Sequence, residues 1–378
     1  MRTFYSRGMP ESHALRRDRL RAAVAASDAD AALITTLVNV RYLTGLASSN
    51  AALLLPVDGP AVLATDSRYA LAAERDCPDV QLLVTRPVET ALAELAVSQG
   101  LGRLAFEAQE MTVVRHTALA AIGGLALLVP LGTCVEELRV VKDAEELDLL
   151  GRACAITGWA FDWAVPHIRA GMTERELAVL IERAMVDAGA ERPAFDTIVA
   201  SGPNGAIPHH SPGERPFEPG DMITIDCGAR YAGYHADMTR TVALGEPAGW
   251  QQEIYDLVAA AQRAGIEAAA DGAAVADVDA AARDLIDAAG HGEHFGHGLG
   301  HGVGLEIHEA PMVGYARPGR LGDRVPITVE PGIYLPGNGG VRIEDTLVVR
   351  SGAGSAAARD LLTTTETVTP GELLVLEP

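Results

Sequence analysis

The chain has 378 residues, 48% of them hydrophobic, and a formal net charge of −21. This length predicts two domains, and the acidic charge argues against nucleic acid or an anionic membrane as a partner. No apolar stretch approaches the ~18 residues that span a bilayer, and the N-terminal stretch lacks the apolar core of a secretory signal. Four scattered cysteines without a C-x-x-C pair favour a reduced, cytoplasmic protein.

The first 140 residues alternate between helical and strand-like patterns and carry no cluster of catalytic residue types. This alternation predicts a small α/β domain. Its expected elements are, in chain order, a helix, a strand followed by a turn, a hairpin and two helices, at residues 12–27, 30–46, 51–65, 67–76 and 87–100.

A long amphipathic helix is expected to begin near Lys142, so the domain boundary is placed just before it, giving domains 1–140 and 141–378. Thr173 followed by Glu176 has the spacing of a capping box and predicts the start of another helix. Together these patterns predict an α+β domain in which helices pack on an antiparallel sheet. Two further helices and four strand-bearing stretches are expected at residues 249–269, 274–290, 195–202, 221–244, 325–335 and 339–350.

Residues 294–311 concentrate four of the eleven histidines of the chain. His297 and His301 are four apart, which is the spacing of two zinc ligands on one helical face. However, residues 296–304 also contain five alternating glycines, and each costs a helix about 1 kcal/mol relative to alanine. We therefore expect an extended or looping segment whose backbone passes close to another group. Any further metal ligands must come from elsewhere in the chain.

Two acidic residues share one predicted hairpin within residues 221–244. A turn centred on Tyr231 and Ala232 would place Asp226 directly opposite Asp237. Directly opposed residues of an antiparallel pair share a face, with their Cβ atoms about 5 Å apart. Because two carboxylates in these positions repel each other, a positive group is expected between them.

A second hairpin repeats this arrangement. A turn centred on Gly337 would place Glu330 opposite Glu344. Strand alternation then puts Arg342 on the face of Glu344, whereas Asp345 points to the other face. Two carboxylate pairs and one histidine are a donor set for a dinuclear divalent metal site. Oxygen-rich ligation of this kind favours manganese, iron or cobalt over the ligand sets of structural zinc.

The stretches "IDCGARYAGYHADMTRT", "HGLGHGVGLEIHE", "TVEPGIYL" and "GGVRIEDT" resemble the motifs of the pita-bread metallopeptidases. This family includes aminopeptidase P, prolidase, methionine aminopeptidase and creatinase. The match runs from about residue 150 to about residue 350, and the first 140 residues resemble the creatinase-like N-terminal domain of several members. The resemblance implies an α+β pita-bread catalytic domain, two divalent metal ions per subunit and a homodimer. Manganese is the expected metal, with iron, cobalt or zinc as alternatives.

The resemblance also implies roles for individual residues. Asp237 and Glu344 would bridge the two ions, and Asp226 would chelate one of them. His301 and Glu330 would complete the coordination of the other. The implied metal ligands are therefore Asp226, Asp237, His301, Glu330 and Glu344.

Further residues match positions that act on the substrate in the family. His308 matches a histidine aimed at the substrate carbonyl, and His297 matches one near the substrate amide. His209 matches another substrate-side histidine, whereas the role of the adjacent His210 stays open. Glu330 would move a proton from the nucleophile to the leaving nitrogen. Arg342 resembles a buried arginine that braces the site. The implied catalytic residues are thus His209, His297, His308, Glu330 and Arg342.

The implied reaction is hydrolysis of small peptides with proline in second position, by a hydroxide that bridges the two metal ions. The first expectation is an Xaa-Pro aminopeptidase, which releases the N-terminal residue of longer peptides. The alternative is an Xaa-Pro dipeptidase, or prolidase. Some prolidases have an arginine just after the histidine-glutamate-x-proline motif, where this chain has Met312, although Arg317 could serve. A catalytically inactive binding module is a more remote alternative, because all five ligand positions carry suitable residues.

Overall fold

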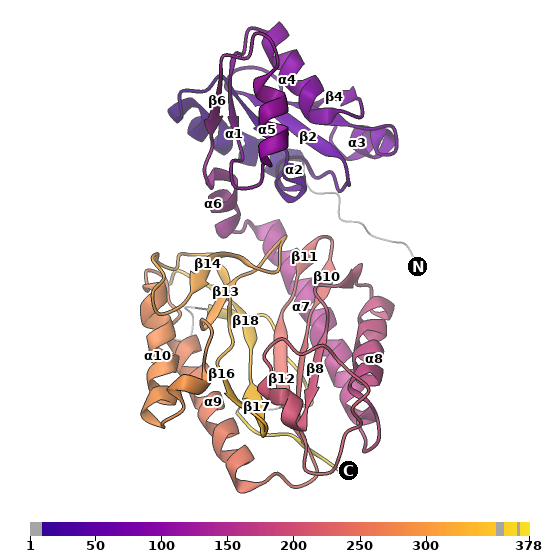
Figure 1. Cartoon of the computed structure of the whole chain (residues 1–378), viewed down its shortest axis with the longest axis vertical. Coiled ribbons are helices and arrows are strands. Elements are labelled where there is room, and N and C mark those ends of the chain that lie inside the picture. Colours follow the sequence, from indigo (N-terminus) through magenta and orange to yellow (C-terminus); the bar gives the residue numbers. More distant parts are fainter. Residues whose placement is uncertain (1–9, 353–358, 369–370) are drawn as a thin grey trace. The chain divides into compact units, whose positions relative to one another are not determined.

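The computed structural model describes residues 10–352, 359–368 and 371–378. The chain divides into two compact units, Met1–Arg139 and Val140–Pro378 (Figure 1). Among the described residues, no helix combines the length and the apolar character needed to cross a bilayer.

The first unit contains a six-stranded mixed sheet with the strand order β4-β3-β2-β1-β5-β6. β2 pairs antiparallel with both β1 and β3, whereas β1–β5, β3–β4 and β5–β6 are parallel pairs. The predicted hairpin and the α/β character are confirmed. The strands are β1 (Ala31–Ile34), β2 (Ala51–Pro56), β3 (Val62–Thr65), β4 (Gln81–Val84), β5 (Arg103–Phe106) and β6 (Leu127–Pro130). The helices are α1 (Pro10–Ala26), α2 (Leu37–Thr44), α3 (Ala70–Asp76), α4 (Val88–Ser98), α5 (Val113–Ala120) and α6 (Cys134–Val140).

One expectation for this unit is wrong. The turn expected after the first strand is the helix α2, which ends at Gly45 with φ 87°. The helix buries Val40 and Leu43. With eight residues it is too short to give a clear helical period in the sequence.

Four α-helices of the second unit lie where the sequence predicts them. α7 begins after Asp143 and α8 after Thr173, and each has a complete capping box, with Glu146 and Glu176 as the third helical residues. Figure 1 shows α9 and α10 on one flank of the unit and α7 and α8 on the other. The helices are α7 (Ala144–Ala164), α8 (Glu174–Asp187), α9 (Gly249–Ala268), α10 (Val275–Ala288) and the short 3₁₀ turns η1 (Val165–His167), η2 (Gly202–Ala206) and η3 (Gly292–His294).

The strands of the second unit form sheets with the orders β11-β10-β7, β20-β12-β9-β8, β14-β13-β15-β18-β19 and β16-β17. Apart from the parallel pair β12–β20, the pairs between the described strands are antiparallel. The α+β prediction is therefore confirmed. The strands are β7 (Arg192–Pro193), β8 (Ile198–Ser201), β9 (Met222–Cys227), β10 (Ala229–Tyr231), β11 (Tyr234–His235), β12 (Met238–Leu244), β13 (Gly300–Gly302), β14 (Glu309–Val313), β15 (Pro326–Val329), β16 (Gly332–Leu335), β17 (Gly339–Arg342), β18 (Asp345–Val349), β19 (Arg359–Leu361) and β20 (Val375–Leu376).

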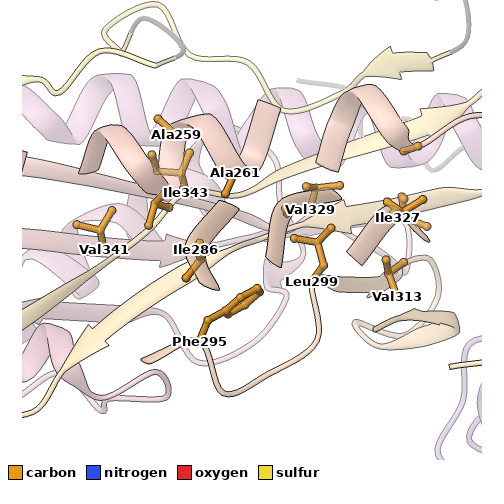
Figure 2. Close-up of a cluster of buried hydrophobic side chains, with 14 of the residues drawn as sticks. Ala259, Ala261, Ile286, Phe295, Leu299, Val313, Ile327, Val329, Val341 and Ile343 are labelled. Carbon is orange, nitrogen blue, oxygen red and sulfur yellow. The ribbon is translucent and has the colours of Figure 1, made fainter. Parts of the chain in front are cut away.

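The largest apolar cluster of this unit joins helices α9 and α10 to the strands behind them. Figure 2 shows Ile286 of α10 near Phe295 and Leu299, and Ile327 and Val329 of β15 in the same cluster. All five of these side chains are buried. Because Phe295 and Leu299 lie within the glycine-histidine segment, on either side of His297, this core fixes the segment on which His297 and His301 lie.

The two hairpins differ in how well their register was predicted. In β16–β17, Gly332 pairs with Arg342 and Leu335 pairs with Gly339, which is the register that a turn centred on Gly337 predicts. Glu330 and Glu344 lie two residues beyond the paired Gly332 and Arg342, and Val329 pairs with Asp345 in the same register on their other side. The predicted relationship of the two glutamates across this hairpin is therefore confirmed.

In the other hairpin the predicted register is wrong by two residues. Asp226 pairs with Thr239 rather than with Asp237. The turn lies at Ala232 and Gly233, which both have positive φ, 47° and 88°. A shift of two residues preserves the face of a strand. Asp237 thus remains on the side of Asp226, as a diagonal neighbour rather than a direct partner.

The glycine-histidine segment is extended, as predicted, and contributes the short strand β13. A Cβ atom on Gly300 would lie 2.0 Å from the carbonyl oxygen of Thr328, and one on Gly302 would lie 2.2 Å from that of Ala310. The group that the backbone passes closely is therefore the backbone of its neighbouring strands. Glycine is required here so that His301 can sit between these strands.

Candidate active site

The second unit contains a cavity of about 840 Å³. Its lining comes from strand ends and loops that are far apart in the sequence, including the ends of β9, β13 and β17. All nine residues expected to bind metal or to act in catalysis line this cavity: His209, Asp226, Asp237, His297, His301, His308, Glu330, Arg342 and Glu344.

Three of these side chains form a compact group at the cavity. One ligand atom each of Asp237, His301 and Glu344 lies within 4.8 Å of the others, and all three residues are buried. Nε2 of His301 is 3.6 Å from Oδ2 of Asp237 and 3.4 Å from Oε1 of Glu330. Carboxylate oxygens and one imidazole nitrogen thus lie close enough together to bind the same metal ion.

The buried carboxylates of this group are poorly compensated. Burial and the negative charges of Glu344 and Asp226 raise the pKa of Asp237 well above its usual range. Burial and the charges of Glu330 and Asp226 do the same for Glu344, and burial raises the pKa of Glu330 to about 8. Oδ1 of Asp226 and Oε1 of Glu344 are buried and have no hydrogen-bond partner among the described residues. Unpartnered buried carboxylate oxygens are costly unless a cation compensates them, so these residues fit divalent metal ions.

The ring of His301 is oriented for metal binding. Its Nδ1 lies 3.0 Å from the carbonyl oxygen of Gly302. Because a carbonyl oxygen only accepts, Nδ1 carries the proton and Nε2 keeps a free lone pair on the side of the carboxylates. Burial lowers the pKa of His301 to about 4, which keeps the ring neutral. A hydrogen bond from the other ring nitrogen to a backbone carbonyl is typical of metal-ligating histidines.

Arg342 is the cation within this group. Its Nη2 donates to Oδ2 of Asp226 at 2.7 Å, and its Nε donates to Oγ1 of Thr239 at 3.1 Å. Thr239 in turn donates to Oε2 of Glu344 at 2.7 Å. Arg342 is buried. Through these hydrogen bonds it braces two carboxylates, Asp226 directly and Glu344 through Thr239. It offsets one negative charge of the four carboxylates.

Tyr334 extends this network to His297. Its hydroxyl accepts from Nη1 of Arg342 at 3.0 Å and lies 2.9 Å from Nε2 of His297. The other nitrogen of His297 is 2.8 Å from the carbonyl oxygen of Gly298. Burial lowers the pKa of His297 to about 4, so a neutral ring faces the tyrosine.

Helix α10 holds the backbone on which His297 lies. Arg283 donates to the carbonyl oxygens of His297 and Phe295, at 2.7 and 2.9 Å. Asp279 pairs with Arg283 and accepts from the backbone nitrogen of Leu299 at 3.0 Å. These bonds satisfy backbone groups of a segment that is not helical.

The remaining histidines lie at the edge of the cavity. The ring of His308 packs edge-on against that of His301, with the centroids 4.4 Å apart. His209 lies on the exposed loop after η2, and the neighbouring His210 bonds to the buried carboxylate of Glu174 at 2.8 Å. His210 also lines the cavity. Of the two adjacent histidines, His209 is exposed and His210 is held by its bond to Glu174.

Asp345 lies outside the cavity, as strand alternation predicts. Its carboxylate accepts from Arg240 and Gln262, both at 2.7 Å. Tyr334 and Thr239 were not among the predicted site residues. Both could have been found by alternation, because Tyr334 shares the strand face of Glu330 and Thr239 shares that of Asp237.

Comparison with known proteins agrees with this geometry. Residues 148–351 match the model of metallopeptidase family M24, and residues 16–141 match that of the creatinase/prolidase N-terminal domain. A Xaa-Pro dipeptidase of Pyrococcus furiosus is 45% identical over 215 residues, which cover 57% of this chain and 62% of that protein.

Two solved structures resemble the whole chain. A Xaa-Pro dipeptidase from Bacillus anthracis has a TM-score of 0.89 and 35% identity, and the match covers 96% of this chain and 100% of that one. An X-Pro aminopeptidase from Thermotoga maritima has a TM-score of 0.85 and 34% identity, with 95% and 99% covered. The catalytic unit has the pita-bread fold of such enzymes, preceded by a creatinase-like N-terminal domain. The family model matches more than half of the residues of this chain, so the chain belongs to metallopeptidase family M24.

Proposed function

We propose that this protein is a metal-dependent Xaa-Pro dipeptidase, which hydrolyses the bond between the first residue and proline. The observation that carries the proposal is the gathering of four carboxylates and one neutral histidine at a single cavity. The buried negative charge of this group exceeds what Arg342 alone offsets. Membership of a metallopeptidase family supports a hydrolase that uses divalent metal ions.

The proposed ligands are the four clustered carboxylates and the neutral histidine beside them: Asp226, Asp237, His301, Glu330 and Glu344. Four carboxylates match the charge of two divalent ions, and oxygen-rich ligation favours manganese, with iron, cobalt or zinc as alternatives. When bound, such ions supply Lewis acidity that polarises the substrate carbonyl and acidifies water.

Four side chains of the cavity, one of them the proposed ligand Glu330, act on the substrate, and Arg342 braces the site. His308 and His209 donate hydrogen bonds to the carbonyl oxygen as negative charge develops there, and each well-placed donor is worth about 3–4 kcal/mol. Glu330 carries the proton from the nucleophile to the leaving nitrogen of proline. His297, held neutral by burial, lies near the substrate amide. Arg342 holds Asp226 and, through Thr239, Glu344 in place.

Two features support a proline dipeptide as the substrate. The cavity wall includes the apolar side chains of Phe195, Ile198, Ile307 and Val313, which suit a pyrrolidine ring. Arg317 also lines the cavity, and a dipeptide presents a free C-terminal carboxylate for which a guanidinium is a strong partner. The similar Pyrococcus and Bacillus proteins, both named Xaa-Pro dipeptidases, also favour a dipeptide substrate.

The second candidate is an Xaa-Pro aminopeptidase, which was the first expectation from the sequence. The Thermotoga structure, named as such an enzyme, is nearly as similar as the Bacillus dipeptidase. Met312, which follows the histidine-glutamate-x-proline motif, is half-exposed and lines the cavity where some prolidases carry an arginine. The two candidates share the metal chemistry and differ in whether the substrate ends at proline.

The test offers one Xaa-Pro dipeptide and one Xaa-Pro-Xaa tripeptide to the chelator-stripped protein, with and without Mn²⁺. We expect cleavage only with metal, and a higher kcat/KM for the dipeptide. A higher kcat/KM for the tripeptide would select the aminopeptidase. Metal-loaded protein that cleaves neither peptide would refute both candidates and favour an inactive binding module.

Variants of the ligand set separate metal binding from general effects of charge. Asp237→Ala should lose both metal and activity. Asp196→Asn is the matched control, because Asp196 lines the same cavity but lies outside the proposed ligand set. It should retain the metal content of the wild type. Equal metal loss in both variants would contradict the assigned ligands.

We also propose the cellular compartment and the oligomeric state in which this activity occurs. All four cysteines are free thiols, which supports a reducing compartment such as the cytoplasm. A homodimer stays a prediction from the family resemblance, and light scattering on the purified protein would test it.

A further inference from the structure

Lys142 and Glu309 form a buried ion pair in the second unit. Nζ of Lys142 lies 2.8 Å from Oε2 of Glu309, and the two side chains are 1% and 5% exposed. The residues are 167 positions apart in the chain. A buried charge is strongly unfavourable without its partner, so each of these two residues constrains where the other can lie. Neither residue lines the catalytic cavity.

Glu309 directly follows His308 and closes the loop on which that histidine lies. Its second oxygen, Oε1, accepts from the backbone nitrogen of Glu306 at 3.0 Å. The carboxylate also packs on Gly304, where a Cβ atom would lie 2.7 Å from Oε2. One side chain therefore joins both ends of the segment 303–309, and Lys142 fixes that side chain from outside the loop.

Helix α7 and its flanking residues hold the same loop at further points. Val303 is buried in an apolar cluster with Leu150 and Ala153 of α7, and Ile307 packs against that cluster. Lys142 precedes the first residue of α7 by two positions. The start and the body of one helix thus both anchor the segment.

A third anchor comes from His235 of β11. Its backbone nitrogen and its Nδ1 both lie within hydrogen-bond distance of the carbonyl oxygen of Gly304, at 2.8 and 3.1 Å. This pair of bonds fixes the beginning of the loop, whereas the ion pair fixes its end at Glu309.

The position of His308 depends on these anchors. In the part of the chain that the structure describes, no hydrogen bond holds the His308 ring, which rests edge-on against His301. Its direction is therefore set by the backbone of residues 303–309. A displacement of about 1 Å of a group near the reacting atoms can lower a rate about 100-fold.

We propose that Lys142 and Glu309 are positioning residues, which hold His308 toward the substrate carbonyl through the loop 303–309. The inference rests on the proposed peptidase function, in which His308 contacts the substrate. Lys142 would thus support catalysis although it does not line the cavity.

The test is a double-mutant cycle between Lys142 and His308. Lys142→Met should lower kcat about 10- to 100-fold with little change in KM, because His308 acts on the transition state. In the His308→Ala background the same change should have almost no further effect on kcat. Amide hydrogen exchange of residues 303–309 should become faster in Lys142→Met, which reports the loop without reference to activity.

Further variants guard against misfolding and trivial loss of stability. Because Lys142→Met leaves a buried carboxylate, the double variant Lys142→Met/Glu309→Leu removes both charges and serves if the single variant does not fold. Arg230→Met is the control, since it deletes a half-buried ion pair with Glu191 that does not line the cavity. Its kcat should equal that of the wild type.

Each failure has a distinct meaning. Wild-type kcat in both the single and the charge-neutral double variant would overturn the positioning role. So would an equal loss of kcat with and without His308, or an equal loss in Arg230→Met. A wild-type protein that cleaves no Xaa-Pro peptide would instead refute the proposed function, independently of the hydrogen-exchange result.

Discussion

The hydroxyl oxygen of Tyr334 lies 2.9 Å from Nε2 of His297 and 3.0 Å from Nη1 of Arg342. Because arginine can only donate, the hydroxyl accepts from Arg342 and is left with its proton to give to His297. His297 then holds its own proton on Nδ1, toward the carbonyl oxygen of Gly298. A continuous series of hydrogen bonds thus runs from Asp226 through Arg342 and Tyr334 to His297.

Tyr334→Phe should break this series while keeping the ring in place. The loss of a buried hydroxyl that serves two partners costs about 1–3 kcal/mol, which corresponds to a fall in kcat of about 10- to 100-fold. Tyr255→Phe is the matched control, because Tyr255 is also buried and donates to the carbonyl oxygen of Glu372. Steady-state kinetics on both variants, with metal content measured in parallel, checks the prediction. Equal kinetics in the two variants would contradict it.

Arg317 should decide whether a free carboxylate is preferred. It is exposed, lines the cavity, and its guanidinium has no hydrogen bond or ion pair among the described residues. A charged hydrogen bond is worth about 1.5–3 kcal/mol, so Arg317→Leu should raise KM for a dipeptide about 10- to 100-fold. A tripeptide or an amidated dipeptide should be much less affected. Arg320→Leu is the control, since Arg320 bonds to the carbonyl oxygen of Gly272 outside the cavity. A uniform rise in KM for all peptides would reject this role.

Metal binding should release protons. In the metal-free protein, burial raises the pKa of Asp237 and Glu344 and raises that of Glu330 to about 8. Glu330 therefore holds a proton at neutral pH that a cation must displace, so the affinity for Mn²⁺ should increase with pH up to about pH 8. Calorimetry in buffers of different ionisation enthalpy measures the number of protons released. A pH-independent affinity with no proton release would contradict the ligand assignment.

The two hairpin turns decide how far the strand register follows from the sequence. "LPGNGG" centres its hairpin on Gly337, which has φ 81°, so the relation of Glu330 to Glu344 follows from the sequence. In the other hairpin Ala232 and Gly233 both adopt positive φ. Centring the turn one residue too early shifted the predicted register by two. The prediction that Asp226 and Asp237 share a face was still correct, because the side chains of a strand alternate with a period of two.

Other features depend on contacts that no local pattern encodes. The links from Arg342 to Thr239 and Tyr334 join side chains from separate strands, and only the assembled sheets bring them together. The ion pair of Lys142 and Glu309 spans 167 positions and has no motif of its own. The metal-ligand candidates were predictable because two carboxylates close together on one strand face indicate a cation, whereas neutral hydrogen-bond partners leave no such signal.

Gly302 should tolerate no side chain. A Cβ atom there would lie 2.2 Å from the carbonyl oxygen of Ala310, so the strand that carries His301 would have to move. Gly302→Ala should lower the free energy of unfolding by about 1–3 kcal/mol and weaken metal binding. Gly296→Ala is the matched control in the same segment, because a Cβ atom at Gly296 meets no atom within 4 Å. Denaturant unfolding and metal titration of the two variants should therefore diverge. Two equally stable variants with equal metal affinity would contradict the close approach of the strands.

His235 should make stability depend on pH in the acid range. Burial lowers its pKa from 6.5 to about 4 in the folded protein. As the pH falls through 6.5, the unfolded chain binds a proton that the folded protein does not bind until about pH 4. The contribution of His235 to stability is therefore complete above pH 6.5 and is lost as the pH falls toward 4.

His235→Gln retains a donor for the carbonyl oxygen of Gly304 but does not titrate. Between pH 7.5 and pH 4.5 the metal-free wild type should lose about 2–3 kcal/mol more of its unfolding free energy than the variant. His297 and His301, whose pKa values burial also lowers to about 4, leave a residual pH dependence in both proteins. Denaturant unfolding at the two pH values gives the difference. Parallel losses in the wild type and the variant would mean that His235 is protonated in the folded protein, and that its bond to Gly304 does not require a neutral ring.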